Sequence, residues 1–316
     1  MLRRSASPAA DILVSIRSRP LYPGDLVEAE IAVTPRASFT ASVGVVRLTQ
    51  TEVLRIDSAR DAVPQMMHPG RRGRSRFGIP DHLDHVFLED AELEGGAVHK
   101  YPVQFRLPVP APPTVKGKYA QITWELAASI LAKSDWLPQR EGILANLAMG
   151  RVGENRQEFV VFAHPDATHI GGERLPERPS ASRVFRSLNM DLSLNSGMAP
   201  NGGAIEGELT VESRSAVKAR ELRVELVRWE RSGHKQARVV ESRQVLQRPA
   251  IQDAGERTDW AFRLPVPDRL MPSVLGQHTF VGWQIRAIMD RTLRPNLSVT
   301  QLVQVYTSPR TDGSSI

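Results

Sequence analysis

A six-residue segment occurs twice in this chain. The letters FRLPVP fill positions 105–110 and return, unchanged, at 262–267, which is 157 residues later. In each place a proline-containing loop follows, and then a glycine with a tryptophan seven residues beyond it, as GKYAQITW at 117–124 and GQHTFVGW at 276–283. An identity of this length inside a longer alignable stretch predicts that the chain contains two copies of one structural unit.

The repeat extends more weakly toward the start of each copy. YPGDLVEAEIAV, beginning at Tyr22, aligns with APNGGAIEGELTV, beginning at Ala199, and here equivalent residues are 178 positions apart. The first copy therefore carries about 21 additional residues before its FRLPVP segment. We place this insertion within positions 58–90, because insertions collect in surface loops.

Alternating apolar and polar residues dominate the regular segments, as in LVEAEIAV from Leu26 and ARELRVELVRWE from Ala219. This period of two places one set of side chains in a core and the other in water. Clusters of Pro, Gly, Asn and Asp separate the segments and supply turns. The pattern predicts an all-β chain of antiparallel β-sandwiches.

The two repeated tryptophans are predicted to anchor the cores. Trp124 shares one strand face with Ile122 and Leu126, and Trp283 shares one with Val281 and Ile285. Tryptophan buries a large apolar area. The repeated segment is thus interpreted as a determinant of the fold, with a ligand platform as the alternative.

Length and composition agree with two globular domains. A chain of 316 residues with 41% hydrophobic and 24% charged residues exceeds one small core. A stretch between the copies is rich in Pro, Gly, Ser and charge and has no strand pattern. We predict an N-terminal sandwich over 1–163, a linker over 164–184 and a C-terminal sandwich over 185–316.

Charge and cysteine content bear on location and partners. No apolar run is long enough to cross a membrane and the chain has no cysteine, so we expect a cytoplasmic protein without thiolate chemistry. The net charge of +6 raises the alternative of an anionic membrane or nucleic acid as partner. Of the 41 basic residues, 35 are arginine, and the basic residues are dispersed along the chain. An arginine bias caused by genome composition is therefore the other explanation of the positive charge.

Several segments together resemble the arrestin-like proteins, a family that includes arrestin-domain adaptors and bacterial sporulation-control proteins. They are PGDLVEAEIAV from Pro23, FRLPVPAPPTVKGKYAQITWELAASI from Phe105, and LNMDLSLNSGMAPNGGAIEGELTVESRS from Leu188. The resemblance spans about Asp11 to Tyr306, and its bacterial branch is the closer analogy, since Pro-Pro-x-Tyr segments are absent. It implies two tandem immunoglobulin-like sandwiches in a non-catalytic scaffold that binds protein partners and needs no cofactor.

Two polar segments in the insertion are candidate sites. GRRGRSRFG groups four arginines whose planar guanidinium groups suit a phosphate or carboxylate on a partner. PDHLDHVFLED groups histidines and carboxylates, which are metal ligands elsewhere, but the spacing matches no established motif and a solvated loop is the alternative. The residues are Arg71, Arg72, Arg74 and Arg76 for the partner, and Asp81, His82, Asp84 and His85 for the metal.

The remaining motifs give no support for catalysis. The chain contains no dinucleotide fingerprint, phosphate-binding loop or zincin helix. Asp135–Arg151 is long enough for one short helix with a loose apolar face. We therefore expect no catalytic, cofactor-binding or metal-binding residues, and a protein-binding scaffold that uses sheet edges, concave faces and the loops of its first domain.

Overall fold

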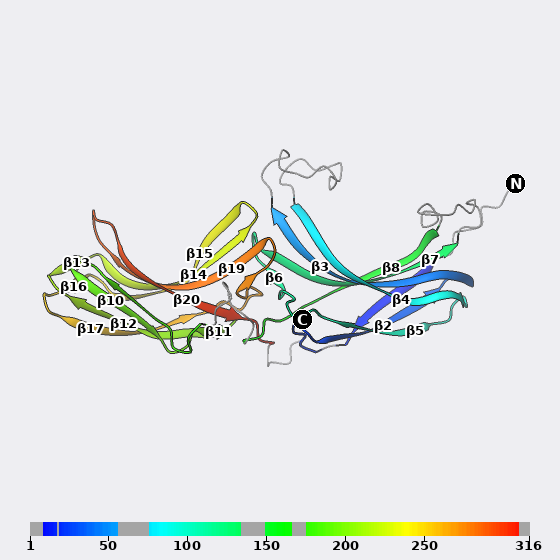
Figure 1. Ribbon diagram of the computed structural model, residues 1–316, viewed down its shortest axis with the longest axis horizontal. Helices are drawn as coiled ribbons and strands as arrows, with labels where there is room; N and C mark the ends of the chain where they lie inside the picture. Colours follow the sequence, from blue (N-terminus) through cyan, green and yellow to red (C-terminus); the bar gives the residue numbers. More distant parts are fainter. Residues whose placement is uncertain (1–8, 18, 56–75, 134–148, 166–174, 310–316) are drawn as a thin grey trace. The chain divides into compact units, whose positions relative to one another are not determined.

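The computed structural model describes residues 9–17, 19–55, 76–133, 149–165 and 175–309 (Figure 1). Within these ranges every regular element is a β-strand, as predicted, and most strand pairs are antiparallel. The described ranges accordingly offer no helix with the length and apolar character needed to cross a membrane.

The strands belong to two compact units. The first comprises Met1–Thr51, Pro80–Ala111 and Thr123–Val161, and the second comprises Glu52–Ile79, Pro112–Ile122 and Phe162–Ile316. Two short stretches from the first half of the sequence are thus part of the second unit. One of them, Pro112–Ile122, contains the first of the two repeated glycines.

The first unit has two facing sheets (Figure 1). One has the strand order β1-β2-β5, and the other β4-β3-β7, with β8 also paired to β7. The short β6 pairs with the first two residues of β7, and these residues belong to the second unit. The bounds are β1 Ala10–Ile16, β2 Leu26–Pro35, β3 Phe39–Arg55, β4 Arg76–Leu93, β5 His99–Arg106, β6 Val115–Lys116, β7 Gln121–Lys133 and β8 Met149–Phe159.

The second unit also has two facing sheets, with the orders β17-β12-β10-β9 and β11-β20-β19-β14-β15. Strand β18 pairs with β19, and β13 pairs with β16. The bounds are β9 Ser180–Val184, β10 Leu188–Leu194, β11 Met198–Pro200, β12 Ala204–Ser213, β13 Val217–Ala219, β14 Glu221–Ser232, β15 Lys235–Gln247, β16 Ala250–Gln252, β17 Arg257–Pro265, β18 Val274–Leu275, β19 Thr279–Asp290 and β20 Leu297–Tyr306.

Corresponding strands of the two sequence copies take corresponding places. The order β1-β2-β5 matches β10-β12-β17, and β4-β3-β7-β8 matches β15-β14-β19-β20. One departure concerns the segment that we predicted as a linker. Its last residues, Ser180–Val184, form the edge strand β9 paired antiparallel to β10, which the polar composition of the segment concealed.

Each unit has its own apolar core between its sheets. Trp124 and Trp283 are 3% and 2% exposed, so the prediction that both are core anchors is confirmed. The Trp283 indole N–H donates to the Met271 carbonyl over 3.0 Å, which satisfies its polar group inside the core. The core of the second unit also includes Val115, which comes from the first half of the sequence.

Candidate functional site

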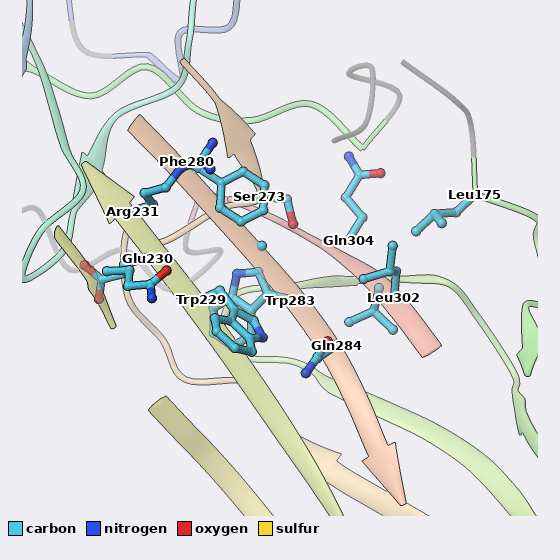
Figure 2. Close-up of a pocket in the computed structure, with 13 residues that line it drawn as sticks. Leu175, Trp229, Glu230, Arg231, Ser273, Phe280, Trp283, Gln284, Leu302 and Gln304 are labelled. Carbon is cyan, nitrogen blue, oxygen red and sulfur yellow. The ribbon is translucent and has the colours of Figure 1, made fainter. Parts of the chain in front are cut away.

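A pocket of about 340 Å³ lies on the second unit, across β14, β19 and β20 (Figure 2). Residues of a strand alternate between its two faces, and Trp283 and Val303 point into the core. The face with the pocket is therefore the one turned away from the core, which we call the outer face. We call the pocket the aromatic pocket; its outer-face residues are Trp229, Arg231, Phe280, Gly282, Gln284, Leu302 and Gln304.

The pocket exists because a glycine stands beside a tryptophan. Trp229 of β14 is directly opposite Gly282 of β19, and residues paired in this way share a sheet face. Glycine has no side chain to fill the space next to the indole ring. The neighbouring pair brings Leu302 opposite Gln284, and the Leu302 side chain is 55% exposed, so the rim of the pocket is apolar.

Two arginines stack on the aromatic rings. The guanidinium carbon of Arg238 lies 5.5 Å from the centroid of the Trp229 ring, and that of Arg231 lies 5.5 Å from the Phe280 centroid. Such stacking stabilises the pair by about 0.5–1 kcal/mol at an exposed site. Among the described residues neither guanidinium group has an ion-pair partner, so both charges remain available to a ligand.

A third cation, Arg286, lies further along the same face of β19. It is half-buried and stands opposite Glu225, but that carboxylate accepts a hydrogen bond from Arg223 Nε over 2.7 Å. Burial, and then the nearby charge of Arg238, lowers the pKa of Arg286 from its ordinary value. The surroundings therefore compensate this positive charge poorly.

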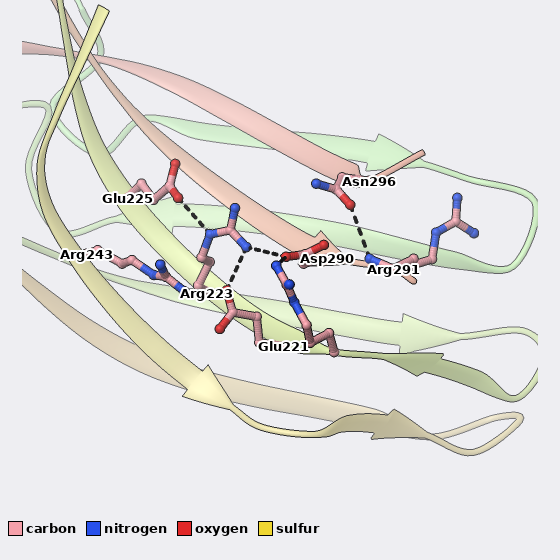
Figure 3. A network of polar contacts seen from close by, with 8 residues as sticks. Glu221, Arg223, Glu225, Arg243, Asp290, Arg291 and Asn296 are labelled. Carbon is pink, nitrogen blue, oxygen red and sulfur yellow. Dashed lines mark hydrogen bonds and ion pairs between the residues drawn. The ribbon is translucent and has the colours of Figure 1, made fainter. Parts of the chain in front are cut away.

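A buried ion network holds the far end of this face (Figure 3). Arg223 is its centre: Nη1 donates to Glu221 over 2.7 Å and to Asp290 over 3.1 Å, in addition to the Nε bond to Glu225. Arg220 also pairs with Asp290 and Arg243 with Glu221. Because arginines already engage these carboxylates, the net charge left around the aromatic pocket is positive.

The repeated glycines have a different role. In the turn that Gly117 opens, the backbone N–H groups of Tyr119 and Ala120 donate to Glu230 Oε2 over 2.8 and 3.2 Å. A Cβ atom on Gly117 would lie 2.5 Å from that same oxygen. Glycine is thus required because the carboxylate approaches the backbone so closely.

The second glycine turn is held in the same way. The N–H groups of Gln277 and His278 donate to Glu52 over 3.1 and 2.8 Å, and a Cβ on Gly276 would lie 2.6 Å from Glu52 Oε1. Glu52 and Glu230 are 178 residues apart, the spacing at which the two copies align. Each turn is therefore closed by the equivalent glutamate of the other copy, and all these residues belong to the second unit.

Burial and hydrogen bonding act against each other at Glu230. Burial raises the pKa of this carboxyl, but the N–H groups of Tyr119 and Ala120 and the ion pair with Arg228 outweigh it and leave the pKa below its ordinary value. Glu230 is 1% exposed, and Arg228 also pairs with Glu241 over 2.7 Å. Glu230 is among the residues at the aromatic pocket, but it alternates with Trp229 and Arg231 along β14, so its carboxylate lies on the other face and holds the turn.

The first unit has a hollow of about 620 Å³ on the equivalent outer face. Small polar residues replace the aromatic ones, since Thr51 and Thr123 stand where the repeat places Trp229 and Gly282. The charges of this face are largely paired among themselves: Arg47 binds both oxygens of Asp84 at 2.6 and 2.8 Å. This face therefore presents less apolar surface and fewer unpaired positive charges to a ligand than the face with the aromatic pocket.

The structure describes only one of the four arginines that were predicted to bind a partner, and only its backbone. Arg71, Arg72 and Arg74 lie outside the described residues. Arg76 begins strand β4, and the structure does not describe its side chain. The segment 134–148, which includes most of the predicted short helix, also lies outside the described residues, whereas Met149 begins β8.

The segment proposed as a metal-binding or solvated loop is instead part of strand β4, so the prediction of a loop was wrong. This strand pairs with β3. Asp84 pairs with Arg47, while His85 packs edge-on to Phe105 with ring centroids 6.1 Å apart. Successive strand residues point to opposite faces, so these two do not converge on one ion. Asp81 and His82 belong to the same strand, and the structure does not describe their side chains.

Within the described ranges no group of three or more His, Cys, Asp or Glu residues is arranged to hold a metal ion. No family model matches the chain, and a search of curated proteins finds no match.

The sequence alone did not lead us to predict the aromatic pocket, although two features of the sequence point to it. The strand ARELRVELVRWE carries large apolar residues on both faces, because Leu222, Val224 and Leu226 lie on the core face and Val227 and Trp229 lie on the other. The repeat also diverges here, with tryptophan and glycine in one copy where the other has two threonines. A comparison of the copies by strand face would have located the pocket.

Proposed function

We propose that this chain is a cytoplasmic, non-catalytic scaffold with two tandem immunoglobulin-like sandwiches in an arrestin-like arrangement, and that it binds a protein partner. The repeated strand order and the two-layered sheets support the arrangement. The observation that carries the function is the aromatic pocket, because tryptophan and arginine are the residues most often responsible for affinity at protein interfaces.

The chemistry of the pocket favours binding over turnover. The nearby carboxylate of Glu230 lies on the other face of β14 and is held by backbone N–H groups, and the Ser273 hydroxyl accepts a hydrogen bond from the Val305 N–H over 3.0 Å. These groups are engaged in structural bonds. What the pocket presents to a ligand is apolar surface and positive charge on rigid strands.

Affinity capture with the full-length chain tests the proposal. Extract of the source cell is passed over wild-type protein and over the double variant Trp229→Thr/Gly282→Thr, and the bound proteins are identified by mass spectrometry. Thr51 and Thr123 occupy the equivalent positions of the first copy, so threonine suits these strands. We expect a discrete set of proteins that the variant loses. Identical sets from both baits, or none from either, contradict the proposal.

An anionic membrane or nucleic acid as partner, suggested by the charge of +6, is separated by salt. Binding of this kind to phosphatidylserine vesicles or duplex DNA falls steeply between low and physiological salt. Association that disappears at physiological salt and is unaffected by the double variant would favour this alternative over the scaffold.

A further inference from the structure

The charges around the aromatic pocket indicate which kind of protein segment it binds. This inference rests on the proposed function. Arg231 stands at one end of the apolar surface, opposite Phe280, and Arg286 stands at the other. Phe280 and Arg286 are six residues apart on β19, which is about 20 Å along a strand at ~3.4 Å per residue. Arg238 lies between them, over Trp229.

The size of the pocket limits what enters its apolar part. A volume of about 340 Å³ is near the lower end of the range for sites that enclose a small molecule. It accommodates one or two large side chains beside Trp229, above the space left by Gly282. A ligand that also reaches the cations at both ends must extend along the sheet.

We infer that the aromatic pocket binds an extended acidic peptide segment in which a large apolar side chain is flanked on both sides by carboxylates. About six extended residues span the 20 Å between the end cations. Cations on both sides of the apolar surface favour a peptide over a single lipid headgroup, which carries its charge at one end only.

The three arginines contribute differently to this recognition. Arg231 and Arg238 are exposed, so they attract the partner and set its orientation more than they add affinity. Arg286 is half-buried beside the engaged Glu225, so a carboxylate placed there relieves an existing imbalance of charge. We expect Arg286 to matter most among the three.

Selection from a display library of random peptides, about twelve residues long, on the immobilised full-length chain tests the inference. We expect enriched peptides to combine acidic residues with a large apolar residue. Their synthetic versions should bind Trp229→Thr/Gly282→Thr at least tenfold more weakly, and Arg286→Gln several-fold more weakly. The matched control is Val184→Thr, which removes an exposed apolar side chain from β9 in the other sheet, and it should bind like the wild type.

The outcomes separate this inference from the scaffold function. Enriched peptides that are neutral or basic, or that bind the double variant equally well, overturn the inference, and so does a selection without enrichment. If affinity capture still finds a partner that depends on Trp229, the scaffold stands and only the acidic segment is wrong. Acidic peptides that bind the pocket while no partner is captured support the inference and contradict the scaffold.

Discussion

The outer sheet faces of the two units are built from equivalent strands but carry different side chains. In the first unit the face of β3 and β7 carries Thr51 and Thr123, and its Arg47 pairs with Asp84 at the surface. In the second unit the equivalent face carries Trp229 and Gly282, with Arg231 and Arg238 stacked on aromatic rings rather than paired with carboxylates. The inner faces remain alike, with a buried tryptophan in each. A repeated unit can therefore keep its core while the surface on the opposite side of the same strands changes.

Tryptophan substitutions give the largest expected contrast between inner and outer faces. Trp283→Ala and Trp124→Ala each remove a buried ring, and we expect each to lower the free energy of unfolding by about 3–5 kcal/mol. Trp229→Thr changes a half-exposed outer-face residue, for which about 0.5 kcal/mol is expected. Urea denaturation followed by circular dichroism measures all three. A large loss for Trp229→Thr would place that residue in the core and break the contrast.

Ion pairs provide the next contrast. Arg223→Ala leaves three carboxylates of a buried network without their common partner, and we expect a loss of about 3 kcal/mol. Arg47→Ala removes a pair whose side chains are 50% and 41% exposed, so the loss should be below about 1 kcal/mol. Equal shifts in the denaturation midpoints of the two variants would show that the ion pairs of the two faces contribute equally to stability.

The carboxylate at the first glycine turn makes the second unit sensitive to acid. Because the folded-state pKa of Glu230 is below the ordinary value of 4.5, its stabilisation is complete above about pH 4.5 and is lost as the pH falls through the lowered value. Glu230→Gln should therefore be less stable at neutral pH by about 2 kcal/mol and lose less stability on acidification. Thermal melts from pH 7 to pH 3 measure this. An unchanged pH profile in the variant would assign the acid sensitivity to other groups.

The smallest expected effect on stability belongs to the arginine-rich insertion. Replacing Arg71, Arg72, Arg74 and Arg76 by serine should leave the melting temperature unchanged and weaken binding of a captured partner, if that partner contacts the insertion as well as the aromatic pocket. Surface plasmon resonance with the partner found by affinity capture measures the affinity. Unchanged affinity would restrict recognition to the second unit.

The sequence alone predicted the inner faces better than the outer ones. Burial imposes a period of two, so Ile122, Trp124 and Leu126 could be assigned to the core without coordinates, and all three are buried. The pocket required knowledge of which strands are neighbours, because Trp229 and Gly282 are 53 residues apart and become a site only by direct pairing. The polar run that contains Asp84 was read as a loop, since a strand exposed on both faces lacks the apolar alternation that marks a buried one.

The exchange of glutamates between the glycine turns constrains how this chain arose and how it can be divided. A copy standing alone would have a turn whose N–H groups lack an acceptor and a glutamate whose oxygens lack those donors. Each copy would lose hydrogen bonds to a charged carboxylate, which stabilise a fold by about 1.5–3 kcal/mol each. Cutting the gene between its two repeats would thus separate each turn from the glutamate that closes it, and in a single-copy ancestor these groups were satisfied by water, by a second molecule of itself or by a different turn.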